Sequence, residues 1–276
     1  MVLRNCADDN DYHAYRERDL RMSTCKVNGV ELYYDVQGKG EAIVFTHGAS
    51  WDHNQWELQM KYFSANYRVV TWDVRGHGQS SLPEGKVDAE DFTRDLICLL
   101  DHLAIEKAHL CGLSMGGHIS LQTAIQYPER VHSLILIGTP FTNSFNWYEK
   151  LFVPINRWSS RVISMKTTAT MQANMLSKNN PHNKGYIEQV VQQIPRRNWI
   201  RLWDAITRME SKEQLGDINC PTLILQGEQD TMIGRQQRYM NEKIKGSTMK
   251  IVENAHHATN LDNPAEVNRY ILEFLQ

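Results

Sequence analysis

Residues 111–117 read CGLSMGG, and this stretch decides how the rest of the chain is interpreted. It holds the pattern Gly-x-Ser-x-Gly, centred on Ser114, between an apolar run and a segment with helical periodicity. A tight turn from a strand into a helix would strain the backbone of Ser114 and expose its hydroxyl above a sheet. The positions of Gly112 and Gly116 would then be too crowded for a side chain. The first free N–H of the helix, that of Met115, would suit a developing oxyanion.

The composition fits a soluble globular protein and argues against several other classes. The chain has 276 residues, of which 41% are hydrophobic and 22% charged, with a formal net charge of −2. At that charge we expect no strong attraction to nucleic acid or anionic lipid, and no apolar run is long enough to span a membrane. The five cysteines are scattered and form no CxxC pair, as expected of reduced thiols in a cytoplasmic protein.

The N-terminal residues 1–24 differ from the rest of the chain. They are polar and lack the apolar centre of a secretory signal. We therefore interpret them as a loosely attached N-terminal arm.

Apolar runs and helical stretches alternate from Val27 onward. A hairpin is predicted over 27–40, with Asn28-Gly29 at its first turn. Amphipathic or capped segments predict helices over 89–105, 115–127 and 264–275, the last with Asn263 as its N-cap. The alternation predicts an α/β fold, a parallel sheet with helices on both faces. Six short apolar runs are the candidate buried strands: residues 41–48, 67–78, 107–114, 131–139, 221–230 and 247–255.

One segment, residues 140–215, breaks this alternation. It contains no convincing strand, is rich in Trp, Met, Asn and Arg, and has helical patches such as 196–211. We therefore predict a core built from residues 25–139 and 216–276, interrupted by a helical cap at 140–215.

Around the Gly-x-Ser-x-Gly turn the chain resembles the α/β-hydrolase fold family, over about residues 25–276. The resemblance implies a mostly parallel sheet flanked by helices, with a helical cap insertion. In this family the second oxyanion donor commonly follows a His-Gly pair, here in THGAS, so the resemblance makes the N–H of Ala49 the partner of Met115. We interpret His47 as a brace for this loop rather than as a base. The stretch DVRGHGQS matches a further family turn, in which Asp73 and Arg75 would hold loops together.

The family order of catalytic residues is serine, then an acid, then histidine. The run LILQGEQD ends at Asp230, which resembles the strand-Gly-x-x-Asp signature of the acid. Glu228 lies in the turn and is expected to face solvent, and Asp217 precedes the strand. Asp73 does not match the chain order. Asp230 is therefore the preferred acid.

The base should follow the last predicted strand, where His256 and His257 are adjacent. The family pattern Gly-His-x-x-x-x-acid-x-Pro, counted back from Asp262 and Pro264, gives His257. A rival alignment on Asn-Ala-His gives His256 but leaves the acid and the proline out of register. We favour His257, because Pro264 starts the last helix and limits the reach of the loop. His256 then stands where glycine is usual, a position it would tolerate at positive φ.

A serine nucleophile with a histidine base and an aspartate supports acyl transfer. The resemblance implies hydrolysis of a carboxylic ester or lactone of a small, largely apolar substrate through an acyl-enzyme, without cofactor or metal. The sequence GLSMGG and the opening HG…DHNQW also resemble the 3-oxoadipate enol-lactonases and related esterases. The alternatives are carbon–carbon bond hydrolysis or perhydrolysis by the same triad, and a small-molecule receptor with slow hydrolase activity.

Substrate choice is expected to lie in the predicted cap, whose apolar residues would form a pocket over the serine. The tentative substrate-binding residues are Trp51, Phe141, Trp147 and His256. The expected partner is the small-molecule substrate alone, with no nucleic acid and no membrane, and the protein is expected to be a monomer or homodimer.

Overall fold

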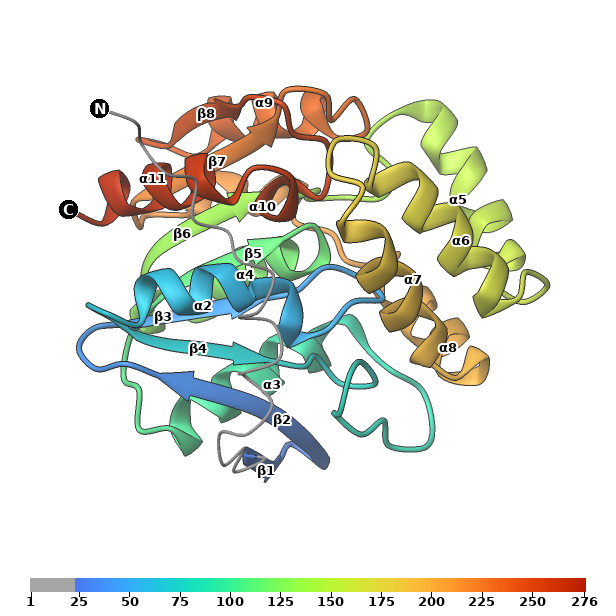
Figure 1. Ribbon diagram of the computed structural model, residues 1–276, viewed down its shortest axis with the longest axis horizontal. Coiled ribbons are helices and arrows are strands. Elements are labelled where there is room, and N and C mark those ends of the chain that lie inside the picture. The colour runs from blue at the N-terminus through green and yellow to red at the C-terminus, as the bar shows by residue number, and fades with distance from the viewer. Residues whose placement is uncertain (1–22) are drawn as a thin grey trace, which may run out of the picture.

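Eight strands form one sheet in the computed structural model, which describes residues 23–276 (Figure 1). Their order across the sheet is β1-β2-β4-β3-β5-β6-β7-β8. β1 and β2 pair antiparallel with each other and β2 pairs antiparallel with β4, whereas β4, β3 and β5 to β8 run parallel. The strands are β1 (Ser23–Val27), β2 (Val30–Gln37), β3 (Ala42–Thr46), β4 (Arg68–Trp72), β5 (Ala108–Leu113), β6 (Val131–Ile137), β7 (Thr222–Gly227) and β8 (Thr248–Val252).

The six apolar runs of the sequence correspond to the six parallel strands β3 to β8, which confirms the prediction of a parallel sheet. Ser23 and Thr24, the last two residues of the predicted N-terminal arm, pair with β2. The rest of that arm, residues 1–22, lies outside the described residues. Four of the five cysteines are described, and all four are free thiols.

Helices cover both faces of the sheet. α2 and α11 lie in front of it in Figure 1, and α3 and α4 lie behind it. The apolar residues of α3 that recur at helical spacing, Phe92, Leu96, Leu99 and Leu100, are fully buried, and Leu103 just after the helix is partly buried. The core helices are α2 (Glu57–Phe63), α3 (Ala89–His102), α4 (Met115–Gln126), α9 (Gly234–Lys243), α10 (Thr259–Asp262) and α11 (Pro264–Leu275), with 3-10 turns η2 (His53–Trp56), η3 (Pro128–Arg130) and η4 (Lys212–Asp217).

Pro264 opens α11 as the sequence indicates. The Asn263 side chain accepts a hydrogen bond from the N–H of Glu266, which is the predicted N-cap. This helix start therefore lies where the alignment of the two histidines needs it.

Four helices occupy the segment between β6 and β7 and lie beside the carboxyl ends of the strands (Figure 1). A single bridge between Thr142 and Glu210 joins the two ends of this segment. The helices are α5 (Trp147–Ser159), α6 (Met165–Leu176), α7 (Asn183–Gln193) and α8 (Arg196–Ile206). No helix within residues 23–276 is long and apolar enough to cross a membrane.

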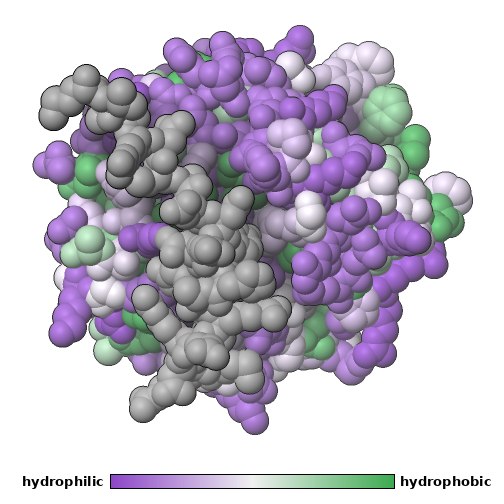
Figure 2. Space-filling model, viewed as in Figure 1, coloured by the Kyte–Doolittle hydropathy of each residue, from purple (hydrophilic) through white to green (hydrophobic). Residues whose placement is uncertain are grey.

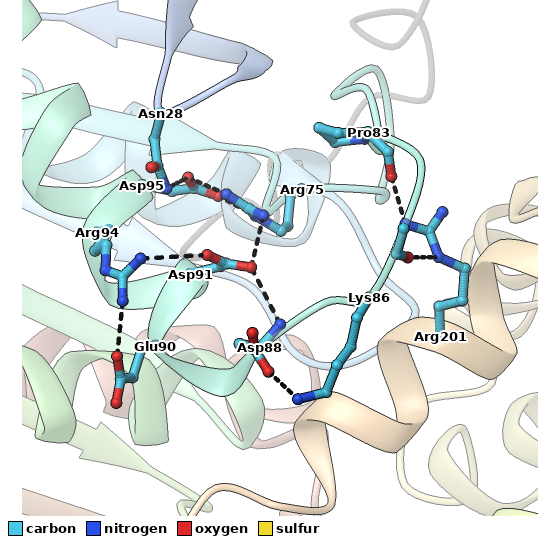
Figure 3. A network of polar contacts seen from close by, with 11 residues as sticks. Asn28, Arg75, Pro83, Lys86, Asp88, Glu90, Asp91, Arg94, Asp95 and Arg201 are labelled. Atoms are coloured by element: carbon cyan, nitrogen blue, oxygen red, sulfur yellow. Dashed lines mark hydrogen bonds and ion pairs between the residues drawn. The ribbon is translucent and has the colours of Figure 1, made fainter.

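The turn after β4 is held by a buried ion pair (Figure 3). The guanidinium of Arg75 donates two hydrogen bonds of 2.6 Å to the carboxylate of Asp95 on α3, and lies 3.0 Å from that of Asp91. Figure 3 also shows Arg201 of α8 donating to the carbonyl of Pro83 in the loop that follows this turn. Arg75 therefore joins the turn after β4 to helix α3, and the loop that follows this turn is bonded to α8.

Removing the Arg75 guanidinium is expected to destabilise the fold strongly. Arg75→Met leaves the fully buried carboxylate of Asp95 without its cation, which should lower the free energy of unfolding by about 3–5 kcal/mol. Urea unfolding followed by circular dichroism measures the change. The matched control is Lys86→Met, which removes an exposed pair with Asp88 and should cost less than about 1 kcal/mol. Equal losses in the two variants would contradict the interpretation.

Candidate active site

Ser114 lies in the sharp turn between β5 and α4, with φ of 54° and ψ of −116°. A positive φ is strained for a serine, and such strain persists only where the surroundings enforce it. The Ser114 N–H donates to the carbonyl of Ile137 on β6 at 2.9 Å, and the Ser114 carbonyl accepts from the N–H of His118 at 3.0 Å. The sheet and the helix therefore hold this backbone from both sides.

The neighbouring glycines make this turn possible. A Cβ at Gly112 would overlap the backbone of Gly116, and one at Gly116 would overlap the carbonyl of Thr46 on β3. The turn around Ser114 therefore packs directly against β5 and β3. The prediction that only glycine fits at these two positions is confirmed.

Asp230 and His257 form a buried pair. Asp230 follows β7 and is 2% exposed, and His257 follows β8 and is 8% exposed. The Nδ1 of His257 and the Oδ2 of Asp230 are 2.8 Å apart. Burial alone would raise the pKa of the Asp230 carboxyl, but the hydrogen bonds from His257 and from the N–H of Met232 hold that pKa below its ordinary value. Asp230 is therefore an ionised partner for the imidazole.

Ser114 and His257 both contact the end of β6. Ser114 is bonded to the carbonyl of Ile137, and the His257 ring lies against the next residue, Gly138. A Cβ at Gly138 would lie 3.3 Å from the Nδ1 of His257, so the glycine leaves room for the ring. Because Nδ1 is bonded to Asp230, Nε2 is the nitrogen left for another group.

His256 takes a different position from its neighbour. Its backbone N–H donates to Oδ2 of Asp262 at 2.9 Å, and its Nδ1 is buried with no partner in the described structure. The suggestion of a positive φ at His256 is wrong, because the positive φ in this loop, 53°, belongs to Asn254. The sharp turn is therefore made two residues earlier, and His256 replaces the usual glycine without backbone strain.

His47 is a structural brace, as expected. It is fully buried, accepts a hydrogen bond from the N–H of Val74 at Nε2 (3.0 Å), and has Nδ1 2.8 Å from the carbonyl of Gly48. Burial lowers the pKa of His47 to about 3. The imidazole is therefore neutral and has no free nitrogen with which to act as a base.

The loop after β3 presents unpaired N–H groups. Gly48 is tied by its N–H to Oε1 of Gln55 at 2.8 Å, and Ser50 adopts a φ of 67°. Among residues 23–276, no group accepts a hydrogen bond from the N–H of Ala49 or of Met115, the first residue of α4. Both predicted donors are therefore available to an external oxygen.

A buried chain of amide side chains connects the two loops of the site, and the sequence analysis missed it. Gln55 donates from Nε2 to Oδ1 of Asn260 at 3.1 Å, and Asn260 donates to the carbonyl of Gln55 at 3.0 Å and to Oε1 of Gln59 at 3.1 Å. Gln59 in turn donates to Asn268 on α11 at 3.0 Å. These residues couple the loop after β3 to α10, which directly follows His257. Amides about 200 positions apart form no local motif that could have revealed them.

Two of the four tentative substrate-binding residues, Phe141 and Trp147, differ sharply in exposure. Phe141 is fully buried in the core, with its ring centroid 5.3 Å from those of Phe145 and Tyr239. Trp147 is 75% exposed at the start of α5, with its ring against Tyr148. Phe141 is thus packed inside the protein and Trp147 is turned to solvent, and their assignment as substrate-binding residues stays a prediction.

Trp51 and His256 remain candidates. Trp51 lies in the loop after β3, and its side chain is buried with the ring edge-on against Tyr186 of α7. Its indole N–H has no acceptor among the described residues. A buried donor without a partner is costly unless another molecule supplies the acceptor.

Two carboxylates that were not preferred as the catalytic acid, Asp73 and Glu228, lie in other surroundings. The Asp73 carboxylate accepts from Nδ1 of His53 at 2.8 Å and from the N–H of Gln79 at 2.8 Å. Glu228 is exposed, as expected. Within the part of the chain that the structure describes, no cluster of three or more His, Cys, Asp or Glu could hold a metal ion.

Buried neutral histidines should make the fold sensitive to acid. Burial lowers the pKa of His118 to about 3, against about 6.5 for an exposed imidazole, so between these values the unfolded chain binds the extra proton. Stability should therefore fall as pH drops through this window, by up to about 1.4 kcal/mol per pH unit for this residue. Urea unfolding of His118→Gln between about pH 7 and pH 4 should show a shallower slope. The exposed His182→Gln is the matched control, and a slope reduced equally in both would contradict the assignment.

Comparison with known proteins agrees with this geometry. A family model described as serine aminopeptidase, S33, matches residues 38–264. The chain belongs to this family. It is thus a serine hydrolase of the α/β-hydrolase fold, an enzyme of the class that acts on ester bonds.

Relatives of this α/β-hydrolase include lactonases and esterases. The chain is 27% identical to 3-oxoadipate enol-lactonase 2 of Acinetobacter baylyi, over 90% of this chain and 94% of that protein. The enol-lactonase structure from Burkholderia xenovorans superposes with a TM-score of 0.84 at 25% identity, covering 92% of this chain and 99% of the other. A thermophilic esterase from Thermogutta terrifontis superposes with a TM-score of 0.81 at 25% identity, covering 92% and 96%.

Proposed function

We propose that this α/β-hydrolase cleaves a carboxylic ester or lactone of a small, largely apolar substrate through an acyl-enzyme on Ser114. The observation that carries the proposal is the arrangement at the end of β6. The strained backbone of Ser114 is hydrogen-bonded to the carbonyl of Ile137. The imidazole of His257 contacts Gly138 and is hydrogen-bonded to the buried Asp230. These are the three groups that a triad needs, in the family's chain order.

In the first half of the reaction the Ser114 oxygen attacks the carbonyl carbon of the substrate. Its proton passes to Nε2 of His257, and the positive charge formed on the ring is stabilised by Asp230. The carbonyl oxygen becomes negative and accepts hydrogen bonds from the N–H groups of Ala49 and Met115. The carbon–oxygen bond then breaks, and the leaving alkoxide takes the proton from His257. In a lactone that hydroxyl stays attached to the acyl group.

In the second half a water molecule attacks the acyl-enzyme. His257 accepts a proton from the water and returns it to the Ser114 oxygen as the acyl bond breaks. The products are a carboxylic acid and an alcohol, or a hydroxy acid from a lactone. No cofactor is needed for this chemistry.

The segment 140–215 is proposed to act as the cap over the site. Ser50 donates to Oε1 of Gln172 on α6 at 2.9 Å, and Tyr186 on α7 donates to the carboxylate of Asp52 at 3.0 Å. On the other side, Asn183 at the start of α7 donates to Asp262, close to the two histidines. These bonds tie α6 and α7 to both loops that carry the reacting groups, which suits a cover that excludes water.

Removing one of these hydrogen bonds between the proposed cap and the loops of the site should affect substrate binding. Gln172→Ala removes the acceptor of Ser50 and should lower kcat/KM about two- to tenfold, mainly through a higher KM. Steady-state kinetics with a chromogenic ester measures the change. Gln192→Ala, at an exposed position on α7, is the matched control and should behave as the parent. A fall in kcat with KM unchanged would contradict the positioning role.

The proposed reaction is tested with a substrate panel. Purified protein is assayed against p-nitrophenyl esters, lactones and thioesters, with a vinylogous diketone for carbon–carbon cleavage and hydrogen peroxide for perhydrolysis. We expect turnover of esters or lactones, with one ¹⁸O atom from labelled water in each acid released. Turnover of the diketone alone would favour the carbon–carbon hydrolase. Binding without turnover of any class would favour the receptor.

A further inference from the structure

The helix α5 presents its apolar face to solvent. Trp147, Leu151, Ile155 and Trp158 follow the spacing i, i+4, i+8 and i+11, so they share one side of the helix, and Phe152 flanks them. These five side chains are between 56% and 75% exposed, and α5 has no buried residue. Figure 2 shows hydrophobic residues at the edge of the molecule where Figure 1 draws α5. We call these five residues the α5 face.

The opposite side of α5 is polar and is the side that contacts the protein. Arg157 donates from Nε to Oγ1 of Thr207 at 2.6 Å and from its other nitrogen to the Thr207 carbonyl at 2.9 Å. Asn156 accepts a hydrogen bond from the indole of Trp203 on α8 at 3.0 Å. In an ordinary surface helix the apolar side packs against the protein, whereas in α5 the polar side does so and the apolar side faces solvent. Hydrogen bonds hold it in place, so its apolar side is left for another surface.

The charge of this region differs from that of the whole chain. Residues 150–187 contain six Lys or Arg and no Asp or Glu, whereas the whole chain has a net charge of −2. Lys150, Arg161 and Lys166 are exposed on α5 and on the segment that leads into α6. The acidic residue of α5, Glu149, is occupied by the N-terminal capping box with Asn146. The carboxylate of Asp204 on α8 also lies near α5, but it is paired with Arg157 and Arg208. The exposed charges on α5 and in the segment that follows it are therefore mainly basic.

We propose that the α5 face docks this enzyme onto an anionic lipid surface. A helix with aromatic and aliphatic residues on one side and basic residues around them is the arrangement that lies in the interface of a bilayer. The tryptophans near both ends of α5 suit the headgroup level, where an apolar ring and a polar N–H are both satisfied. The proposal concerns a surface contact and does not depend on ester hydrolysis.

The charge distribution favours a lipid surface over a second copy of the chain. In a twofold dimer built on the α5 face, the same patch would face itself, so the basic residues of both copies would be brought together. Anionic headgroups instead place opposite charge beside Lys150, Arg161 and Lys166 while the acyl chains receive the apolar side chains.

Vesicle flotation with the full-length protein tests the proposal. Vesicles of phosphatidylglycerol should carry the protein upward, and binding should weaken when salt is raised to about 0.5 M, because salt screens the attraction. Vesicles of phosphatidylcholine should bind at least about tenfold less, since each cation near an anionic surface contributes about fivefold to affinity.

Two sets of substitutions separate the apolar and the electrostatic parts. Phe152→Glu with Trp158→Glu should lower binding to phosphatidylglycerol at least about tenfold, and Lys150→Glu with Arg161→Glu should lower it by a similar factor. Leu58→Glu, at an exposed apolar position on α2, is the matched control and should bind as the parent. Circular dichroism establishes that each variant is folded.

Three results would overturn the proposal. The first is no flotation with phosphatidylglycerol vesicles. The second is equal binding to both lipids with no effect of salt. The third is a dimer in solution that Phe152→Glu with Trp158→Glu converts to a monomer, since a second copy would then cover the α5 face.

Discussion

Ser114→Ala is expected to abolish ester and lactone hydrolysis. The hydroxyl is the proposed nucleophile, and the alanine has no atom that can form the acyl-enzyme, so kcat should fall at least about 10,000-fold. The hydrogen bonds that hold this turn join the backbone of residue 114 to Ile137 and His118 and do not use the hydroxyl, so the turn itself should survive. Labelling with a fluorophosphonate probe measures the same group directly, and the parent should be labelled while the variant is not.

The control for this experiment is Ser120→Ala. Ser120 lies on the same helix, α4, and is fully buried with its hydroxyl bonded to the carbonyl of Gly116. Its loss should leave labelling intact. Equal labelling of the parent and Ser114→Ala, or no labelling of the parent, would disprove the serine mechanism.

The adjacent histidines are expected to behave very differently. His257→Ala removes the imidazole that is bonded to Asp230 and should lower kcat at least about 1,000-fold. His256→Ala removes a ring that makes no side-chain hydrogen bond among the described residues, so it should keep more than about a tenth of the activity. Steady-state kinetics of the two variants with one ester gives the comparison.

Each variant is the other's control, because the two positions share the same loop. The backbone bond from His256 to Asp262 remains in both, so a loss confined to His257→Ala reports the side chain and not the loop. The reverse pattern, with His256→Ala inactive and His257→Ala active, would favour the rival alignment on Asn-Ala-His.

Much of the fold was readable from local patterns. The apolar runs correspond to the parallel strands, and for β3 to β7 the reason is that a strand buried on both faces must be hydrophobic along most of its length. β8 is the edge strand and is mostly exposed. The Gly-x-Ser-x-Gly turn was readable because its crowding excludes side chains, whatever the rest of the fold does. The pairing of Asp230 with His257 was expected from the resemblance to the family, whose chain order and spacing before Pro264 point to these two residues.

Long-range contacts were not readable in this way. The amide chain from Gln55 to Asn260 depends on two segments about 200 residues apart meeting in the core. The exposure of Trp147 and the burial of Phe141 depend on which side of the insertion faces the sheet, and composition does not specify this. Composition therefore gave no guide to where either side chain would lie.

The sequence by itself therefore determined the sheet and the turn around Ser114, because both rest on spacing along the chain. The choice between His256 and His257 rested on the family resemblance and on the start of α11. Only the tertiary structure decided how these elements face one another. It placed the His257 ring on Gly138 beside the strand end that holds Ser114. It also turned the apolar side of α5 outward, because hydrogen bonds from Arg157 and to Asn156 fasten the polar side to the protein. Periodicity shows that a helix has two faces, but only packing shows which one meets solvent.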